Sequence, residues 1–152
     1  MAKNEISVET TVPILVVEDE SDYTVLIKDA LSGAGFPCSL QAVESGEEAI
    51  AYLSRQGKYA DDEKYPFPSL LLLDLKMPGV GGFGVLRWLA TQPDVRRKLN
   101  VVILSGSQST KEIEVVFELG AHLFWPKSDC LTLASRIRCL QRLWTCPELR
   151  AT

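Results

Sequence analysis

Residues 70–79 read LLLLDLKMPG, and this stretch decides the predicted fold. Four successive leucines are typical of a short strand buried on both faces, as in a parallel sheet. The strand ends at Asp74 and leads into a segment rich in turn-forming residues. In open sheets of this kind, ligands bind beyond the carboxyl ends of the strands, so Asp74 is the first candidate site residue.

Four further apolar runs have the length of a strand and alternate with stretches that carry helix signals. These runs are residues 12–17, 36–43, 101–104 and 122–125. The helix signals include two capping boxes, Ser45 with Glu48 and Ser109 with Glu112. Five strands alternating with five helices predict an α/β fold with a parallel sheet covered on both faces. Among the few topologies with right-handed crossovers, we expect the flavodoxin-like doubly wound (βα)5 fold, with strand order 2-1-3-4-5.

The spacing of apolar residues also predicts which helix faces are buried. The expected buried positions are Val25, Leu26, Ala30 and Leu31 in the first helix, Ile113, Val116, Phe117 and Gly120 in the fourth, and Cys130, Leu133, Ile137, Leu140 and Trp144 in the last. Residues 56–68 contain two prolines and three consecutive acids, which predict a polar loop.

The length of 152 residues is room for one domain. We place that domain at residues 12–144, between an N-terminal extension (1–11) and a C-terminal tail (145–152). Apolar residues make up 46% and charged residues 24%, which is typical of a soluble globular chain and excludes a largely disordered one. No apolar run approaches the length of a membrane helix, and the first residues lack the apolar core of a secretion signal, so we expect a cytoplasmic protein without membrane contact.

The net charge of −4 makes nucleic-acid binding an unfavoured function. The basic residues near the end are expected to form a solvated helix face; they are Arg136, Arg138, Arg142 and Arg150. The four cysteines form no CxxC pair, which argues against a zinc site or a disulfide framework. His122 has no metal-binding partner in the sequence and is interpreted as an ordinary loop or strand residue.

Polar residues follow the predicted strands at the edge where ligands bind. They are Glu18, Asp19 and Glu20 after the first strand, Glu44 after the second, Asp74 after the third, Ser105 after the fourth and Lys127 after the fifth. A single acid after one strand is usually a helix cap or a solvated loop residue. The combination of acids, hydroxyl and lysine is far more specific.

Neighbouring carboxylates repel one another unless a cation neutralises them, and Mg²⁺ is the natural hard cation for such a set. Asp19 and Asp74 are candidates for direct metal ligands, together with the Lys76 backbone carbonyl, and Glu18 for a ligand through water. With the metal in place, Asp74 is a plausible phosphoryl acceptor, because a carboxylate can form an acyl phosphate. Lys127 would neutralise one phosphoryl oxygen and Ser105 would donate a hydrogen bond to another.

Between about Val12 and Leu143, the chain resembles the CheY-like receiver domains of bacterial two-component response regulators. The segments that carry the resemblance are ILVVEDE (14–20), LLDLKMPG (72–79), VILSG (102–106) and GAHLFWPK (120–127). It implies that Asp74 accepts a phosphoryl group from a histidine kinase or histidine phosphotransfer protein.

The resemblance also assigns roles to the remaining site residues. Glu18 and Asp19 match the acidic pair that holds Mg²⁺ (or Mn²⁺), and Lys127 matches the phosphate-binding lysine. Ser105 and Phe124 match the switch pair, in which the aromatic side chain turns inward as the hydroxyl moves toward the phosphoryl group. Such a protein is a phospho-accepting signalling domain rather than an enzyme, and assists only its own phosphorylation and dephosphorylation.

The expected output surface is the fourth helix, the fifth strand and the fifth helix. Only eight residues follow Trp144, so we expect the output to be a protein contact, including a possible homodimer, or onward phosphotransfer. Val115, Leu119 and Trp125 lie off the main buried stripe and either form an apolar contact patch or belong to the core.

The sequence departs from the family pattern at several positions. Ser128 stands where a proline usually follows the lysine, and this leaves open whether the Lys127–Ser128 peptide bond is cis or trans. Pro126 is an unusual neighbour of Lys127. Gly81 and Gly84 replace acids, which suggests a more mobile loop. The segment 56–68 is longer than in short receivers; it either resembles that of single-domain regulators associated with phytochrome-type kinases or is a tolerated surface loop.

Two alternatives compete with a phosphorylation-switched receiver. A haloacid-dehalogenase-type phosphatase needs a second aspartate two residues after the first, where this chain has Lys76, which cannot serve as the general acid. A phosphorylation-independent adaptor on the same fold is supported only by the Ser128 departure.

Overall fold

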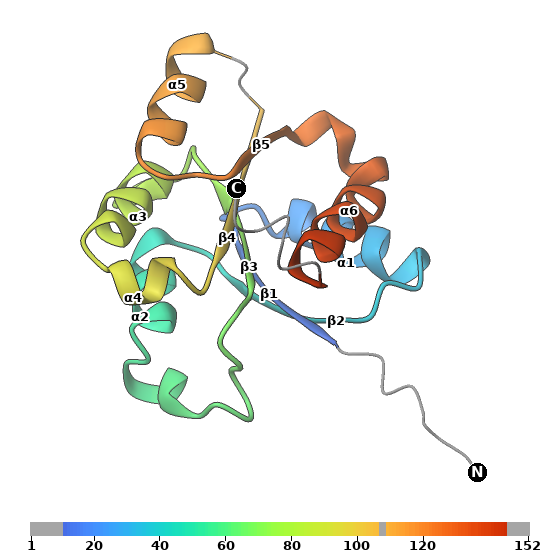
Figure 1. Ribbon diagram of the computed structural model, residues 1–152, viewed down its shortest axis with the longest axis horizontal. Coiled ribbons are helices and arrows are strands. Elements are labelled where there is room, and N and C mark those ends of the chain that lie inside the picture. The colour runs from blue at the N-terminus through green and yellow to red at the C-terminus, as the bar shows by residue number, and fades with distance from the viewer. Residues whose placement is uncertain (1–10, 107–108, 146–152) are drawn as a thin grey trace.

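The computed structural model describes residues 11–106 and 109–145. Its centre is a five-stranded sheet with the order β2-β1-β3-β4-β5 and parallel pairing throughout (Figure 1). The strands are β1 (Val12–Val17), β2 (Cys38–Val43), β3 (Leu70–Asp74), β4 (Asn100–Ser105) and β5 (Leu123–Pro126). The predicted flavodoxin-like fold and strand order are confirmed.

Helices cover both faces of the sheet. They are α1 (Ser21–Gly33), α2 (Gly46–Leu53), α3 (Gly81–Ala90), α4 (Pro93–Arg96), α5 (Thr110–Glu118) and α6 (Leu133–Thr145), with 3-10 turns η1 (Gly57–Ala60) and η2 (Lys127–Thr132). α1 and α6 lie on one face, and α2, α3 and α5 on the other (Figure 1). α4 is a short helix beyond the five expected; it begins at a proline, whose fixed φ suits a first helical position.

The leucine run of β3 is buried on both faces of the sheet. Leu71 and Leu73 belong to the core under α2, α3 and α5, whereas Leu70 and Leu72 belong to the core under α1 and α6. All four are completely buried, because successive side chains of a strand point to opposite faces. Asp74 then ends the strand, in register with Leu104 of β4.

Three tyrosines make the segment after α2 more than the polar loop that the sequence predicted. The rings of Tyr52 and Tyr59 lie 4.8 Å apart, and those of Tyr59 and Tyr65 5.0 Å apart. Tyr59 is only 7% exposed and belongs to the larger core. Residues 60–64 are exposed as expected, and the prediction missed the burial of Tyr59, because α2 supplies an aromatic partner that the segment's own composition does not reveal.

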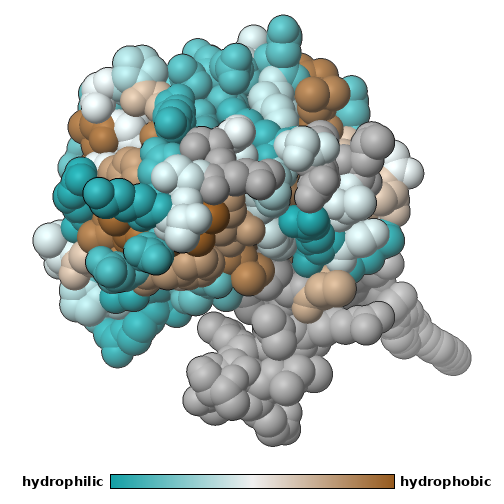
Figure 2. Space-filling model, turned by 90° about the horizontal axis from the view of Figure 1, so that it is seen from above, coloured by the Kyte–Doolittle hydropathy of each residue, from teal (hydrophilic) through white to brown (hydrophobic). Residues whose placement is uncertain are grey.

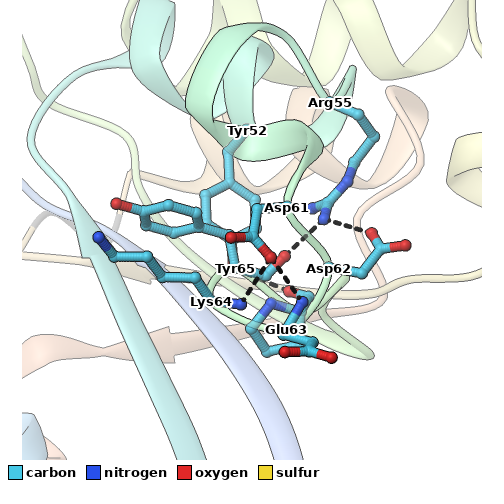
Figure 3. A network of polar contacts seen from close by, with 8 residues as sticks. Tyr52, Arg55, Asp61, Asp62, Glu63, Lys64 and Tyr65 are labelled. Carbon is cyan, nitrogen blue, oxygen red and sulfur yellow. Dashed lines mark hydrogen bonds and ion pairs between the residues drawn. The ribbon is translucent and has the colours of Figure 1, made fainter.

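Polar contacts of Arg55 and Asp61 also hold this segment in place (Figure 3). Arg55 Nη2 donates to Asp62 Oδ1 at 2.7 Å and to the Tyr65 carbonyl at 2.5 Å. Asp61 Oδ1 accepts from the backbone N–H groups of residues 63 and 64. Asp61 and Asp62 therefore hold the segment in a turn next to the packed tyrosine rings. The alternative of a tolerated surface loop stays a prediction.

Two of the predicted buried helix faces are partly wrong. In α1, Ile27 and Leu31 are buried, while Val25 and Leu26 are each 52% exposed. In α5, Val116 is buried, but Phe117 is 44% exposed. Short apolar pairs fit more than one helical face, so the sheet rather than the spacing decides which one turns inward. Leu133 and Ile137 of α6 are buried as expected, and the side chains of Cys130, Leu140 and Trp144 lie outside the described residues.

One of the two capping boxes forms a cap. Ser45 Oγ accepts from the Glu48 N–H at 3.1 Å at the start of α2, and Glu48 Oε2 accepts from the Tyr59 hydroxyl. Ser109 occupies the N-cap of α5 without a side-chain capping bond.

The candidate apolar patch is largely core. Trp125 is buried and packs with the α1–α6 core, and Leu119 packs against the other core, whereas Val115 is half-buried. On the face seen in Figure 2, hydrophobic side chains form separate groups among hydrophilic ones. The exposed large hydrophobic side chains of the described residues are Val25, Leu26, Val80 and Phe117.

The structure shows the contacts of some of the remaining basic, cysteine and histidine residues. Arg138 donates to the Ala34 carbonyl at 2.6 Å, Arg136 lies over the Trp125 ring, and Arg142 and Arg150 are outside the described side chains. Cys38 and Cys139 are free thiols, and Cys130 and Cys146 lie outside the described side chains. His122 Nδ1 accepts from the Val101 N–H at 2.9 Å. In the described part of the chain, no helix has the length and apolar character needed to cross a bilayer.

Candidate functional site

The predicted site residues converge at the carboxyl edge of the sheet. Glu18 and Asp19 follow β1, Asp74 ends β3, Ser105 ends β4 and Lys127 follows β5. Because all strands run in parallel, their carboxyl ends meet at this edge, in a hollow of about 360 Å³ lined by Glu20, Asp74, Lys76, Gly106 and Lys127. Glu44, after the edge strand β2, is not among the residues that line the hollow.

Lys127 lies among three carboxylates. Its Nζ is 2.7 Å from Glu18 Oε1, 3.5 Å from Asp74 Oδ1 and 3.7 Å from Glu20 Oε1. Its side chain is 17% exposed, and those of Glu18 and Asp74 are 1% and 3% exposed. The ammonium is therefore positioned beside the carboxylate that the sequence singled out.

The acids form a group suited to a hard divalent cation. One carboxylate oxygen of each of Glu18, Asp19 and Asp74 lies within 4.8 Å of the others. Buried Glu18 Oε1 makes an ion pair with Lys127 but no hydrogen bond of good geometry within the described residues. An all-oxygen donor set with an under-satisfied buried carboxylate fits Mg²⁺ or Mn²⁺.

Burial disfavours the charged forms of Glu18 and Asp74. Burial raises the pKa of Glu18 to about 7; the Lys127 ammonium opposes this rise and the Asp74 carboxylate adds to it. Burial also raises the pKa of Asp74, against the effect of Lys127. Burial acts to lower the pKa of Lys127, but its carboxylate neighbours outweigh that effect and raise it. A cation at the group would restore the charged acids.

Lys76 contributes to the site in two observed ways. Its backbone N–H donates to Asp74 Oδ1 at 3.3 Å, and its Nζ pairs with Glu112 Oε2 of α5 at 3.5 Å. The first contact orients the Asp74 carboxylate. The role of the Lys76 carbonyl as a metal ligand stays a prediction.

The two switch residues have different environments. Ser105 is completely buried at the end of β4, whereas Phe124 is half-buried and packs against the core under α3 and α5. Ser105 pairs in register with Pro126, next to Lys127. Their positions allow the switch roles, which stay predictions.

Close packing explains the glycines after Asp74. A Cβ at Gly82 would lie 2.4 Å from the Asp74 carbonyl oxygen, and Gly81 has φ +66°. A Cβ at Gly84 would lie 2.4 Å from Cγ1 of Val80. Glycine at positions 81 and 82 therefore lets α3 begin directly against the end of β3, and glycine at position 84 makes room for the Val80 side chain.

Tyr23 of α1 is the site residue that sequence reasoning missed, and it contacts the segment after β5. The described residues contain no cis peptide bond, so the Lys127–Ser128 bond is trans. The Tyr23 hydroxyl of α1 donates to the Lys127 carbonyl at 3.1 Å, and Lys127 Nζ lies 4.6 Å from the centroid of the Tyr23 ring. Tyr23 and Lys127 are 104 residues apart, so no local pattern connects them.

Comparison with known proteins identifies the class. The family model of the response regulator receiver domain matches residues 14–138. Response regulator Rcp1 of Synechocystis sp. is 31% identical over 132 residues, covering 86% of this chain and 87% of that protein. The transcriptional regulator NtrC of Salmonella typhimurium is 27% identical over 75% of this chain, which matches only 21% of NtrC.

Solved structures agree. The phosphorylated cyanobacterial phytochrome response regulator RcpA has a TM-score of 0.75 at 31% identity, covering 91% of this chain and 96% of RcpA. The Mn²⁺-bound form of Rcp1 has a TM-score of 0.72 at 30% identity, covering 83% and 91%. The fold and site thus define a CheY-like signalling domain of two-component systems. This chain belongs to the response regulator receiver family, and its likeness to phytochrome response regulators is confirmed.

Proposed function

We propose that this chain is a single-domain response regulator that accepts a phosphoryl group on Asp74 in a Mg²⁺-dependent reaction. The observation that carries the proposal is the position of the Lys127 ammonium between the buried carboxylates of Glu18 and Asp74. The receiver is taken as residues 12–144, with the flanking segments 1–11 and 145–152 outside it.

The residues divide the chemistry among them. An Asp74 carboxylate oxygen bonds to phosphorus, while the bond from phosphorus to the donor breaks and its electron pair leaves with the donor. Asp19, Asp74 and the Lys76 carbonyl, with Glu18 through water, would hold Mg²⁺, which would supply positive charge to the transferred group. Lys127 neutralises one phosphoryl oxygen and Ser105 donates a hydrogen bond to another, after which Phe124 turns inward.

The proposed donor is a phytochrome-type histidine kinase, or a histidine phosphotransfer protein that it supplies. The support is the similarity to RcpA and Rcp1 over most of both chains. The proposed output is a protein contact on α5, β5 and α6, including a second copy of this chain. The net charge of −4 gives no support to nucleic-acid binding, and the proposed location is the cytoplasm.

Phosphorylation of the purified protein tests the proposal. After incubation with acetyl phosphate and Mg²⁺, we expect intact mass to show one phosphate-sized gain that needs Mg²⁺ and is absent in Asp74→Asn. Asp62→Asn is the matched control, because Asp62 is 85% exposed and lies in the segment after α2. No gain with acetyl phosphate or with candidate kinases, while another receiver is modified, would favour the phosphorylation-independent adaptor.

A further inference from the structure

Tyr23 contacts Lys127 at both ends of the lysine residue. Its hydroxyl donates to the Lys127 backbone carbonyl at 3.1 Å, and its ring faces the ammonium, with 4.6 Å between Nζ and the ring centroid. A cation at this distance from an aromatic face is attracted to it. The hydroxyl therefore fixes the backbone of Lys127, and the ring fixes the tip of its side chain.

The ring differs from the other neighbours of the ammonium. Glu18, Glu20 and Asp74 are carboxylates at 2.7, 3.7 and 3.5 Å. Metal binding and phosphoryl transfer change the charge at Glu18 and Asp74, so their pull on Lys127 changes during the reaction. The Tyr23 ring carries no net charge, so metal binding and phosphoryl transfer do not change a charge on it.

The Tyr23 contact also connects α1 to the backbone of the segment after β5. Ser128 follows Lys127, and the peptide bond between them is trans. α1 packs against η2, which begins at Lys127, and the Tyr23 hydroxyl bonds to the first carbonyl of that turn. Tyr23 thus ties the backbone beside the site to a helix that packs on the sheet.

We propose that Tyr23 is a positioning residue that holds Lys127 in place for phosphoryl transfer to Asp74. The inference rests on the proposed function for its kinetic part. The contact itself is a property of the unphosphorylated protein and is testable without that reaction.

Phosphorylation rates of two variants separate the effect of the Tyr23 ring from that of its hydroxyl. We expect Tyr23→Leu, which loses ring and hydroxyl, to slow phosphorylation by acetyl phosphate about tenfold at saturating Mg²⁺. Tyr23→Phe keeps the ring and should slow it about threefold. Val25→Ala is the control on the same helix, because Val25 is 52% exposed. Equal rates in wild type and Tyr23→Leu would overturn the proposal.

A double-mutant cycle distinguishes positioning from a general loss of structure. If Tyr23 acts through Lys127, Tyr23→Leu has no further effect on the rate in a Lys127→Ala background. A full additional loss in that background would mean that Tyr23 acts by another route and would contradict the proposal.

NMR tests the contact even if the protein is not phosphorylated or the Tyr23→Leu variant does not fold. A ring above the ammonium shifts the NMR signals of the Lys127 methylene groups nearest Nζ, and we expect this shift in wild type and in Tyr23→Phe. Ordinary lysine shifts in both proteins would overturn the contact. Absence of phosphorylation with the ring shift present would instead refute the proposed function and leave the contact standing.

Discussion

Gly82 shows how closely the site depends on single residues. The N–H of Gly82 donates to the Leu75 carbonyl, and the space beside its Cα is filled by the end of β3. The carbonyl that blocks this space belongs to Asp74. The backbone at Asp74, the proposed phosphoacceptor, and the start of α3 therefore fit together only without a side chain at position 82.

We predict that Gly82→Ala lowers the free energy of unfolding by about 1–3 kcal/mol, because the added methyl group would lie 2.4 Å from a backbone oxygen. The control is Gly33→Ala at the end of α1, where an added Cβ meets nothing within 4 Å. That change should be neutral or stabilise by up to about 1 kcal/mol. Urea unfolding measures both, and equal effects would contradict the steric explanation.

At the scale of elements, the sequence predicted the strands better than the helix faces. A strand such as Leu70–Leu73 is buried on both sides, so its composition alone identifies it. Which side of α1 is buried depends on the sheet, and Val25 and Ile27 are equally apolar in sequence. The carboxylates and Lys127 were predictable because they follow strands, whereas Tyr23 was not, because its contact crosses from α1 to η2.

The segment between α2 and β3 provides a test at this scale. We predict that Tyr59→Ala costs about 3 kcal/mol of unfolding free energy, because the ring is buried between Tyr52 and Tyr65. Glu63→Ala, at an exposed position of the same segment, should change stability by less than about 0.5 kcal/mol. Denaturant unfolding compares the two, and similar small losses would favour the alternative of a tolerated surface loop.

At the scale of the whole molecule, the site links stability to protons and metal. The pKa of Glu18 rises from 4.5 to about 7 on folding, so between these pH values the folded chain keeps a proton that the unfolded chain has released. The free energy of unfolding without metal should therefore fall as pH rises through this window. The proposed Mg²⁺ site needs the deprotonated acids, so the stabilising effect of Mg²⁺ should grow over the same window.

We predict that the melting temperature of wild type without metal falls, relative to Glu18→Gln, by on the order of a few degrees from pH 5 to pH 7.5. Added Mg²⁺ should raise the wild-type melting temperature more at pH 7.5 than at pH 5. Differential scanning calorimetry measures both effects. A Mg²⁺ effect that is independent of pH would show that Glu18 does not compete for protons with the metal.

The ion pair between Lys76 and Glu112 joins the loop beside Asp74 to the first turn of α5. Lys76 is 62% exposed, and exposed pairs of this kind contribute at most about 1 kcal/mol and weaken with salt. Thermal energy therefore suffices to break and re-form this ion pair. Breaking the pair costs little, so the ionic strength of the surroundings sets how often it is formed, while the core contacts of Val116 hold α5 on the sheet.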